Sequence, residues 1–154
     1  MVIFTVEDLT KSDIPAVMSI AEQANLSRWS EKDLLEELLL VESIAFKLSD
    51  ASSECLGFVI GRIVPGFIRD LDAELYNIGI VDSFRRKGGG TLLLERFITE
   101  CGLKGAHNIW LDVRASNHPA LSFYSKFGFY ADGARKNFYS DPTEDAVLMR
   151  LELK

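Results

Sequence analysis

The residues best placed to do chemistry lie between Ile78 and Thr91, where a predicted strand passes through a basic turn into a predicted helix. The turn reads Arg85-Arg86-Lys87-Gly88-Gly89-Gly90 in a chain whose net charge is −6. Glycine lets the backbone approach a ligand closely, and a helix start offers unpaired N–H groups and the positive end of the dipole. This combination predicts an anion site, and a pyrophosphate is the ligand that suits it.

Two common nucleotide motifs do not account for this turn. The Walker spacing, with Gly-Lys followed by Ser or Thr, does not occur in the chain. Gly88 and Gly90 fit the first two positions of the dinucleotide fingerprint, but Leu93 fills the third, where a small residue is needed. Asp112 stands where that fingerprint has its ribose-binding acid, so the exclusion is strong rather than absolute. A plain helix-start turn without a ligand is the structural alternative.

Several blocks along the chain resemble the GCN5-related N-acetyltransferase (GNAT) superfamily. The turn matches its signature, which reads Arg or Gln, two variable residues, Gly, one variable residue, then Gly or Ala. The further matching blocks are residues 28–32, 73–78, 110–117, 120–129 and 135–139. The resemblance spans approximately residues 5–150 and extends to bacterial enzymes that acetylate the N-terminal alanine of a small-subunit ribosomal protein.

The resemblance implies acetyl-CoA as the acetyl donor and no metal. Backbone groups of Ile78, Gly79 and Ile80 would hold the pantetheine arm like an added strand. Asn117 would hydrogen-bond the same arm, and N–H groups from Arg86 to Thr91 would bind the pyrophosphate. The cofactor-binding residues expected in the turn are Arg85, Arg86, Lys87, Gly88, Gly89, Gly90 and Thr91.

Transfer of an acetyl group to an amine needs a proton acceptor and a proton donor. A free α-amine has a pKa near ~8 and must lose a proton before it attacks a thioester. The resemblance implies Tyr124 as the acid beside the coenzyme A sulfur. It implies Asp112 as the base, although related enzymes carry the longer Glu there, which favours a proton path through water. Glu74 matches the catalytic Glu of the histone-acetylating branch and is the alternative or additional base.

Each of these residues also has an ordinary structural interpretation. Asp112 would pair with Arg114 on the same strand face, and Glu74 would be a solvated strand acid. Tyr124 would be a core aromatic of its helix. By resemblance, the acceptor side is expected at Trp29, Tyr76, Phe138 and Tyr139, which could equally be packing residues.

The order of predicted elements indicates one α+β domain over residues 1–154, with a mixed, mostly antiparallel sheet and helices on both faces. Strands are expected at residues 2–6, 44–48, 56–64, 75–81, 109–113, 129–131 and 146–153. The first two helices are expected to begin at Ser12 and at Ser30, the second with Leu34, Leu35, Leu38 and Leu39 buried. Two more are expected at residues 88–101, with Leu94, Phe97, Ile98 and Cys101 buried, and from Pro119 to Gly128.

Composition bounds the compartment and the partners. Hydrophobic residues make up 47% and charged residues 26%, which is typical of a globular protein. The acidic excess disfavours nucleic acid and anionic membranes as partners. No apolar run reaches the ~20 residues of a membrane span, and no signal peptide is evident. The two separated cysteines, Cys55 and Cys101, fit a reducing compartment, so a cytoplasmic protein is expected.

The expected partner is an acceptor protein or peptide N-terminus, such as that of a ribosomal protein, with the chain itself a monomer or a weak homodimer. Two other functions stay open from the sequence. One is acetylation of another amine, such as a lysine side chain, a polyamine or an antibiotic. The other is a non-catalytic module that binds coenzyme A.

Overall fold

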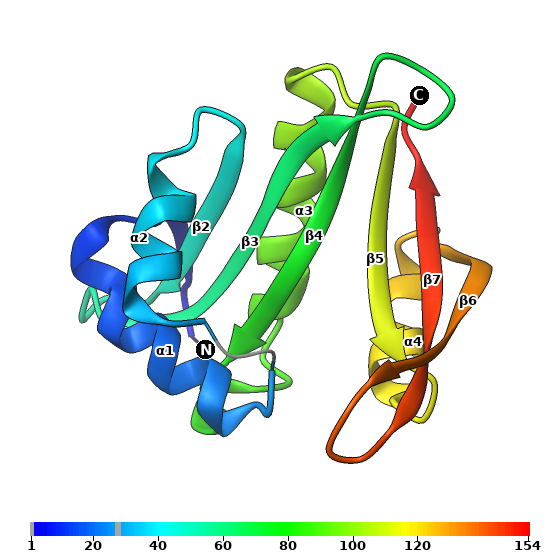
Figure 1. The fold of residues 1–154 in the computed structure, drawn as a ribbon. Helices are drawn as coiled ribbons and strands as arrows, with labels where there is room; N and C mark the ends of the chain where they lie inside the picture. Colours follow the sequence, from blue (N-terminus) through cyan, green and yellow to red (C-terminus); the bar gives the residue numbers. More distant parts are fainter. Residues whose placement is uncertain (1, 27–28) are drawn as a thin grey trace.

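The structure is a computed structural model that describes residues 2–26 and 29–154 (Figure 1). One sheet holds seven strands in the order β1-β2-β3-β4-β5-β7-β6. Their bounds are β1 Thr5–Asp8, β2 Ser43–Ser49, β3 Cys55–Pro65, β4 Leu71–Ile80, β5 Asn108–Arg114, β6 Tyr130–Tyr139 and β7 Glu144–Glu152. Only β4 and β5 pair in parallel, and the other neighbours are antiparallel. The expected mixed, mostly antiparallel sheet is confirmed.

Helices cover both faces of this sheet, as predicted. They are α1 Ile14–Gln23, α2 Glu31–Leu39, α3 Gly89–Leu103 and α4 His118–Lys126. Helices α1 and α2 lie on one face, and α3 and α4 lie on the other (Figure 1). Within the described part of the chain, none of these helices has both the length and the apolar character needed to cross a bilayer.

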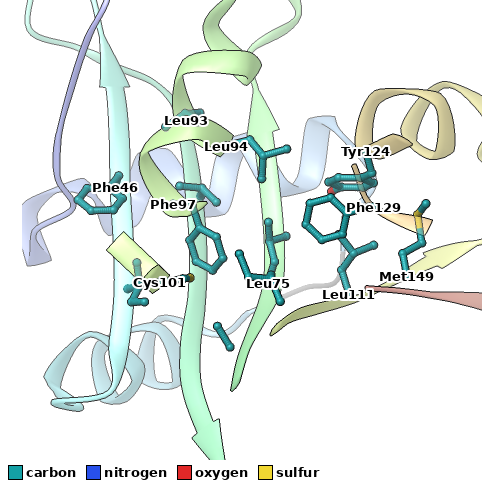
Figure 2. Packing of buried hydrophobic residues seen from close by; sticks show 14 of the residues in the cluster. Phe46, Leu75, Leu93, Leu94, Phe97, Cys101, Leu111, Tyr124, Phe129 and Met149 are labelled. Carbon is teal, nitrogen blue, oxygen red and sulfur yellow. The ribbon is translucent and has the colours of Figure 1, made fainter. Parts of the chain in front are cut away.

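A hydrophobic core lies on each face of the sheet. On the α3 side, Leu94 and Phe97 of α3 pack toward Leu75 of β4, and the same cluster continues to Leu111 and Tyr124 (Figure 2). The second core joins α1 and α2 to β3; its members include Val17, Ile20, Leu34, Phe58 and Ile60. Burying side chains of this size stabilises the fold by about 1.5–3 kcal/mol each. These two cores hold the sheet between its helical layers.

The start of the first helix differs from the prediction. Asp13, rather than Ser12, precedes α1, after a short 3-10 turn over Lys11–Asp13. The Asp13 carboxylate accepts a hydrogen bond from Thr10 N at 2.9 Å and pairs with Lys47 Nζ at 3.1 Å. Because one carboxylate ties the turn to a strand, the helix boundary follows Asp13. Pro15 lies in the first turn, as expected.

The second helix confirms its predicted cap and, except at Leu39, its predicted inner side, because Leu35 and Leu38 also pack against the core. Ser30 Oγ accepts a hydrogen bond from Asp33 N at 3.0 Å, and Leu34 is fully buried. Leu39 is 76% exposed, whereas Glu37 is 3% exposed and ion-paired with Arg62. Leu39 is the last residue of α2, so the expected burial there was wrong because no further turn brings it against the sheet. In the block at residues 28–32, Arg28 lies outside the described residues.

Strand bounds also differ from the prediction, in the two edge strands and in the central β4, which begins at Leu71 instead of residue 75. Strand β1 begins at Thr5 instead of residue 2, and β6 extends to Tyr139 instead of ending at residue 131. Nearly all of β6 is exposed, so its sequence carries no apolar alternation that marks a strand. In α3, Leu94, Phe97 and Cys101 are buried as predicted, while Ile98 is only partly buried.

Gly89 and Gly90 give a matched test of packing at the start of α3. A Cβ on Gly89 would lie 2.4 Å from Cδ2 of the buried Leu48, whereas one on Gly90 would meet nothing closer than 3.5 Å. We expect Gly89→Ala to lower the free energy of unfolding by about 1–3 kcal/mol through overpacking. Gly90→Ala should leave it unchanged or raise it. Urea denaturation of both variants measures this, and equal stabilities would contradict it.

Candidate active site

The site begins where β4 and β5 separate. Their parallel pairing consists of Ala73 opposite Ile109 and Glu74 opposite Trp110. Two residues later the register of β4 against β3 shifts, so that Tyr76 is an extra residue between the pairs Gly61–Leu75 and Ile60–Asn77. Such a bulge bends a strand and increases its twist. The bulge therefore coincides with the divergence of the two strands seen in Figure 1.

Divergence leaves one edge of β4 without a strand partner beyond Glu74. Val81 N donates to Leu56 O of β3 at 2.9 Å, and backbone groups alternate in direction along a strand. Gly79 therefore faces β3, while the N–H and C=O groups of Ile78 and Ile80 face the β5 side. Of the three residues predicted to hold a pantetheine arm, two present their peptide groups to the open edge.

The basic turn offers a run of free amide donors. Among the described residues, no N–H group from Arg86 to Thr91 donates a hydrogen bond. The first N–H group after the turn to do so is that of Leu92, which donates to Gly88 O at 3.2 Å. Gly88 has φ +89° and Arg86 has φ +60°, so the backbone is left-handed at both positions. Six free N–H groups at the positive end of α3 suit a bound anion.

The side chains of this turn differ in availability. Arg85 Nε donates to Ile80 O at 3.2 Å, and its guanidinium pairs with Asp82 at 3.1 Å. Arg85 thus fastens the turn to the end of β4. Arg86 and Lys87 are exposed. Leu93 is fully buried at the position where the dinucleotide fingerprint needs a small residue, which agrees with the exclusion made from the sequence.

Tyr124 belongs to the hydrophobic core on the α3 side of the sheet. It is 8% exposed, its ring lies 5.6 Å from that of Phe129, and it comes from α4 on the side of Leu111 (Figure 2). Burial, and to a lesser degree the nearby Tyr139, raises the pKa of Tyr124 far above its ordinary value. Tyr124 therefore stays protonated and retains a proton to donate.

Asp112 projects from β5 on the opposite face of the sheet. Its Oδ1 lies 2.9 Å from Arg135 Nε of β6, so the predicted pairing with Arg114 is wrong. Arg135 can reach Asp112 because β6 lies beyond β7, whose Leu148 is the register partner of Asp112. The ion pair between Arg135 and Asp112 could not be predicted, since nothing in the sequence relates β6 to β5.

Glu74 lies on β4 and lines a cavity of about 250 Å³ that Trp110 and Arg135 also line. No ion pair to Glu74 is present among the described residues. Burial, followed by the charge of Glu74, raises the pKa of Tyr76. Both candidate bases therefore lie on the face opposite α3, and Asp112 differs from Glu74 in having a guanidinium partner.

Arg114 organises the turn that joins β6 to β7. It donates to Ser140 O and to Pro142 O, each at 3.1 Å, and pairs with Glu144 at 3.3 Å. Its guanidinium also lies 4.5 Å from the ring centroid of Tyr139. One side chain thus fixes the turn next to Phe138 and Tyr139. The sequence places Arg114 and Asp112 on one face of the strand, and this predicted an ion pair between them. It did not indicate that Arg114 would instead hold the turn between β6 and β7.

The remaining predicted residues lie at the edges of this region. Trp29 packs against Tyr76 with ring centroids 6.0 Å apart, and Trp29 Nε1 lies 2.6 Å from the Asn77 side-chain oxygen in the amide orientation that satisfies both. Phe138 is 50% exposed, and Tyr139 is partly buried. Asn117 caps α4 by accepting from Ala120 N at 3.2 Å, so its side-chain N–H groups remain available.

A mixed sheet that opens between two parallel strands, with a free-amide turn at the end of one of them, defines an acyl-CoA N-acyltransferase fold. Comparison with known proteins agrees. The profile of the Acetyltransferase (GNAT) family matches residues 14–129. The ribosomal protein bS18-alanine N-acetyltransferase of Escherichia coli is 32% identical over 151 residues, which covers 97% of each protein. Its Salmonella typhimurium counterpart is 34% identical over 153 residues, with the same coverage.

Solved structures give the same result. The crystal structure of the Escherichia coli enzyme has a TM-score of 0.85 and 32% identity, covering 99% of this chain and 95% of that one. Arabidopsis thaliana NAA60 in complex with acetyl-CoA shares the fold, with a TM-score of 0.87 at 18% identity over 98% of this chain and 99% of that one. The chain belongs to the Acetyltransferase (GNAT) family and is an acetyl-CoA-dependent N-acetyltransferase.

Arg114→Met tests the organisation of the β6–β7 turn. Loss of two hydrogen bonds to carbonyl groups and of the Glu144 pair should raise amide hydrogen exchange at residues 139–144 by about tenfold or more. Exchange within α3 should stay unchanged. Arg85→Met is the matched control, because Arg85 contacts Asp82 and Ile80 instead. Equal exchange at residues 139–144 in the two variants would contradict this role.

The buried Tyr124 hydroxyl predicts a pH dependence of stability. An unfolded tyrosine ionises near pH ~10, whereas folded Tyr124 holds its proton, so its contribution is complete below that pH and is lost as pH rises. The free energy of unfolding should fall by about 1.4 kcal/mol per pH unit above pH ~10 on this account. Denaturation of wild type and Tyr124→Phe between pH ~8 and ~11 measures it. Parallel curves for the two proteins would refute the prediction.

Proposed function

We propose that this enzyme transfers the acetyl group of acetyl-CoA to the N-terminal α-amine of a protein, and that its acceptor is the N-terminal alanine of a small-subunit ribosomal protein. The observation that carries this proposal is similarity along 97% of both chains to enzymes named for that reaction. The enzyme would act in the cytoplasm, as a single domain and as a monomer or weak homodimer.

The donor site is proposed at the end of β4 and the start of α3. The six N–H groups from Arg86 to Thr91 would bind the pyrophosphate. The peptide groups of Ile78 and the N–H of Ile80 would pair with the amides of the pantetheine arm, while the Ile80 carbonyl accepts from Arg85. The side-chain N–H groups of Asn117 are free to reach the same arm, because its oxygen caps α4. Arg86 and Lys87 would add charge at the rim, while Arg85 holds the turn in place.

The reaction chemistry uses groups on both faces of the sheet. Acetyl-CoA supplies an activated thioester, and the acceptor amine attacks its carbonyl carbon directly. Asp112 and Glu74 lie on the face where the amine would arrive, and one of them would accept its proton, directly or through water. Tyr124 lies on the other face, stays protonated at neutral pH, and would protonate the leaving thiolate.

The acceptor peptide is proposed to lie between two pairs of aromatic side chains on one face of the sheet. Trp29 and Tyr76 form a packed aromatic pair on one side, and Phe138 and Tyr139 form another, with ring centroids 5.1 Å apart. Arg114 holds the second pair in position. The net charge of −6 favours a basic acceptor through electrostatic complementarity.

Acceptor identity is tested by thiol release from acetyl-CoA with mass spectrometry of the products. We expect acetylation of a ribosomal-protein peptide that begins with a free alanine. The same peptide with a blocked N-terminus, an internal-lysine peptide and spermidine serve as controls and should react at least about tenfold more slowly, because the α-amine loses its proton most easily. Faster reaction with a small amine or a lysine side chain would overturn the proposed acceptor.

Substitutions separate the catalytic roles. Tyr124→Phe should lower kcat about 100-fold with the Kd for acetyl-CoA retained, since a positioned acid contributes about that much. Tyr130→Phe, which removes an exposed hydroxyl from β6, is the matched control. Of Asp112→Asn and Glu74→Gln, the variant with the larger loss of kcat identifies the base. Unchanged turnover in Tyr124→Phe and in both carboxylate variants would reject these roles.

A further inference from the structure

A cavity of about 250 Å³ contains one residue of the mechanism above, Glu74, and its other lining residues have no role there. It opens at the closed end of the β4–β5 pair, on the sheet face that Asp112 shares. Its lining residues are Phe67, Glu74, Trp110, Asp132, Arg135 and Leu148. The volume is below the roughly 300 Å³ of the smallest drug-sized ligand pockets, so it suits one side chain rather than a whole cofactor.

The apolar wall of this cavity is open to solvent. Phe67, in the loop between β3 and β4, is 84% exposed, and its ring lies 5.6 Å from that of Trp110 in an edge-on arrangement. Leu148 of β7 completes the wall. An exposed phenylalanine held against a second aromatic ring gains little from folding, and apolar surface presented in this way marks a place for contact with a ligand.

A buried carboxylate fixes this wall in advance. Asp72 is 1% exposed and accepts hydrogen bonds from Trp110 Nε1 at 2.8 Å and from Asn108 Nδ2 at 3.1 Å. The backbone N–H of Phe67 also points to Asp72, at 3.4 Å. The indole and the loop are therefore held in position by the protein itself. A preorganised wall lowers the entropic cost of binding.

The charges around the cavity leave one carboxylate without a cation. Arg135 is neutralised by Asp112 at 2.9 Å, and Asp132 is neutralised by Arg150 at 3.0 Å. Glu74 forms no ion pair within the described residues. An unpaired carboxylate beside an aromatic and aliphatic wall complements a side chain with an apolar stem and a positive end.

We propose that this cavity is a specificity subsite for the acceptor, which binds one lysine or arginine side chain downstream of the acetylated residue. The stem would lie on Phe67 and Leu148, and the charged group would meet Glu74. This inference rests on the proposed function, because it takes the acceptor to be a peptide and takes Asp112, not Glu74, to be the base. It adds that a particular position of that peptide is read by charge and by length.

A peptide series tests the charge requirement. Each peptide begins with alanine and carries arginine, citrulline or norleucine at one of the next five positions, with the other positions held neutral. We expect one position at which arginine raises kcat/KM about tenfold over both replacements, as a desolvated charged contact would. Equal kcat/KM for arginine and norleucine at every position would show that no cation is bound and would overturn the proposal.

Two variants of adjacent loop residues locate the effect. Phe67→Ser removes the open wall, and Ile68→Ser is the matched control, since Ile68 is also exposed, at 71%, but does not line the cavity. Phe67→Ser should raise KM about tenfold for the arginine and norleucine peptides alike, with kcat unchanged, because both side chains have an apolar stem that would lie on Phe67. Ile68→Ser should change neither.

The outcomes separate this inference from the function on which it rests. If no peptide is acetylated by the wild-type enzyme, the proposed function fails. If peptides are acetylated but Phe67→Ser behaves like Ile68→Ser with every peptide, the subsite alone is overturned.

Discussion

The active region depends on the limited pairing between β4 and β5. Two residue pairs join these strands, and the extra residue Tyr76 then turns β4 away. A fully paired sheet would have used the peptide groups of Ile78 and Ile80 in ladder hydrogen bonds. Because the ladder stops, those groups face the opening, and the chain of β4 leads directly to the free amides at the start of α3. One irregularity thus creates both parts of the donor site.

The closed end of the same pair is held by polar contacts. Asp72 receives donors from β5, and Asn108 passes the network on to Arg150 of β7 through a hydrogen bond of 3.2 Å. Buried polar groups that are fully partnered give a rigid arrangement, since any displacement would leave one of them unsatisfied. These hydrogen bonds fix β4 and β5 at their paired end, while the two strands diverge beyond Glu74.

Much of the fold, and the free amides of the glycine turn where the donor site is proposed, could be predicted from the sequence, because local patterns encode them. The strict alternation at residues 109–113 and the glycine turn each specify their own structure. What could not be predicted depends on contacts between distant segments. Arg135 reaches Asp112 only because β6 pairs beyond β7. The boundary of α1 lies at Asp13, whose carboxylate contacts both Thr10 N and the distant Lys47. Strand β6 also lacks the apolar period that would have revealed its length.

An anion site made of main-chain amides limits the amino-acid sequence of the turn at only a few positions. Every amino acid except proline brings the same N–H group, so exchanges at Lys87 and Thr91 would leave the proposed diphosphate site largely intact. The fragile positions are those where the backbone path itself needs glycine, namely Gly88 with its left-handed φ and Gly89 against Leu48. The surface charge of this turn can therefore change among related sequences while its backbone keeps the same conformation.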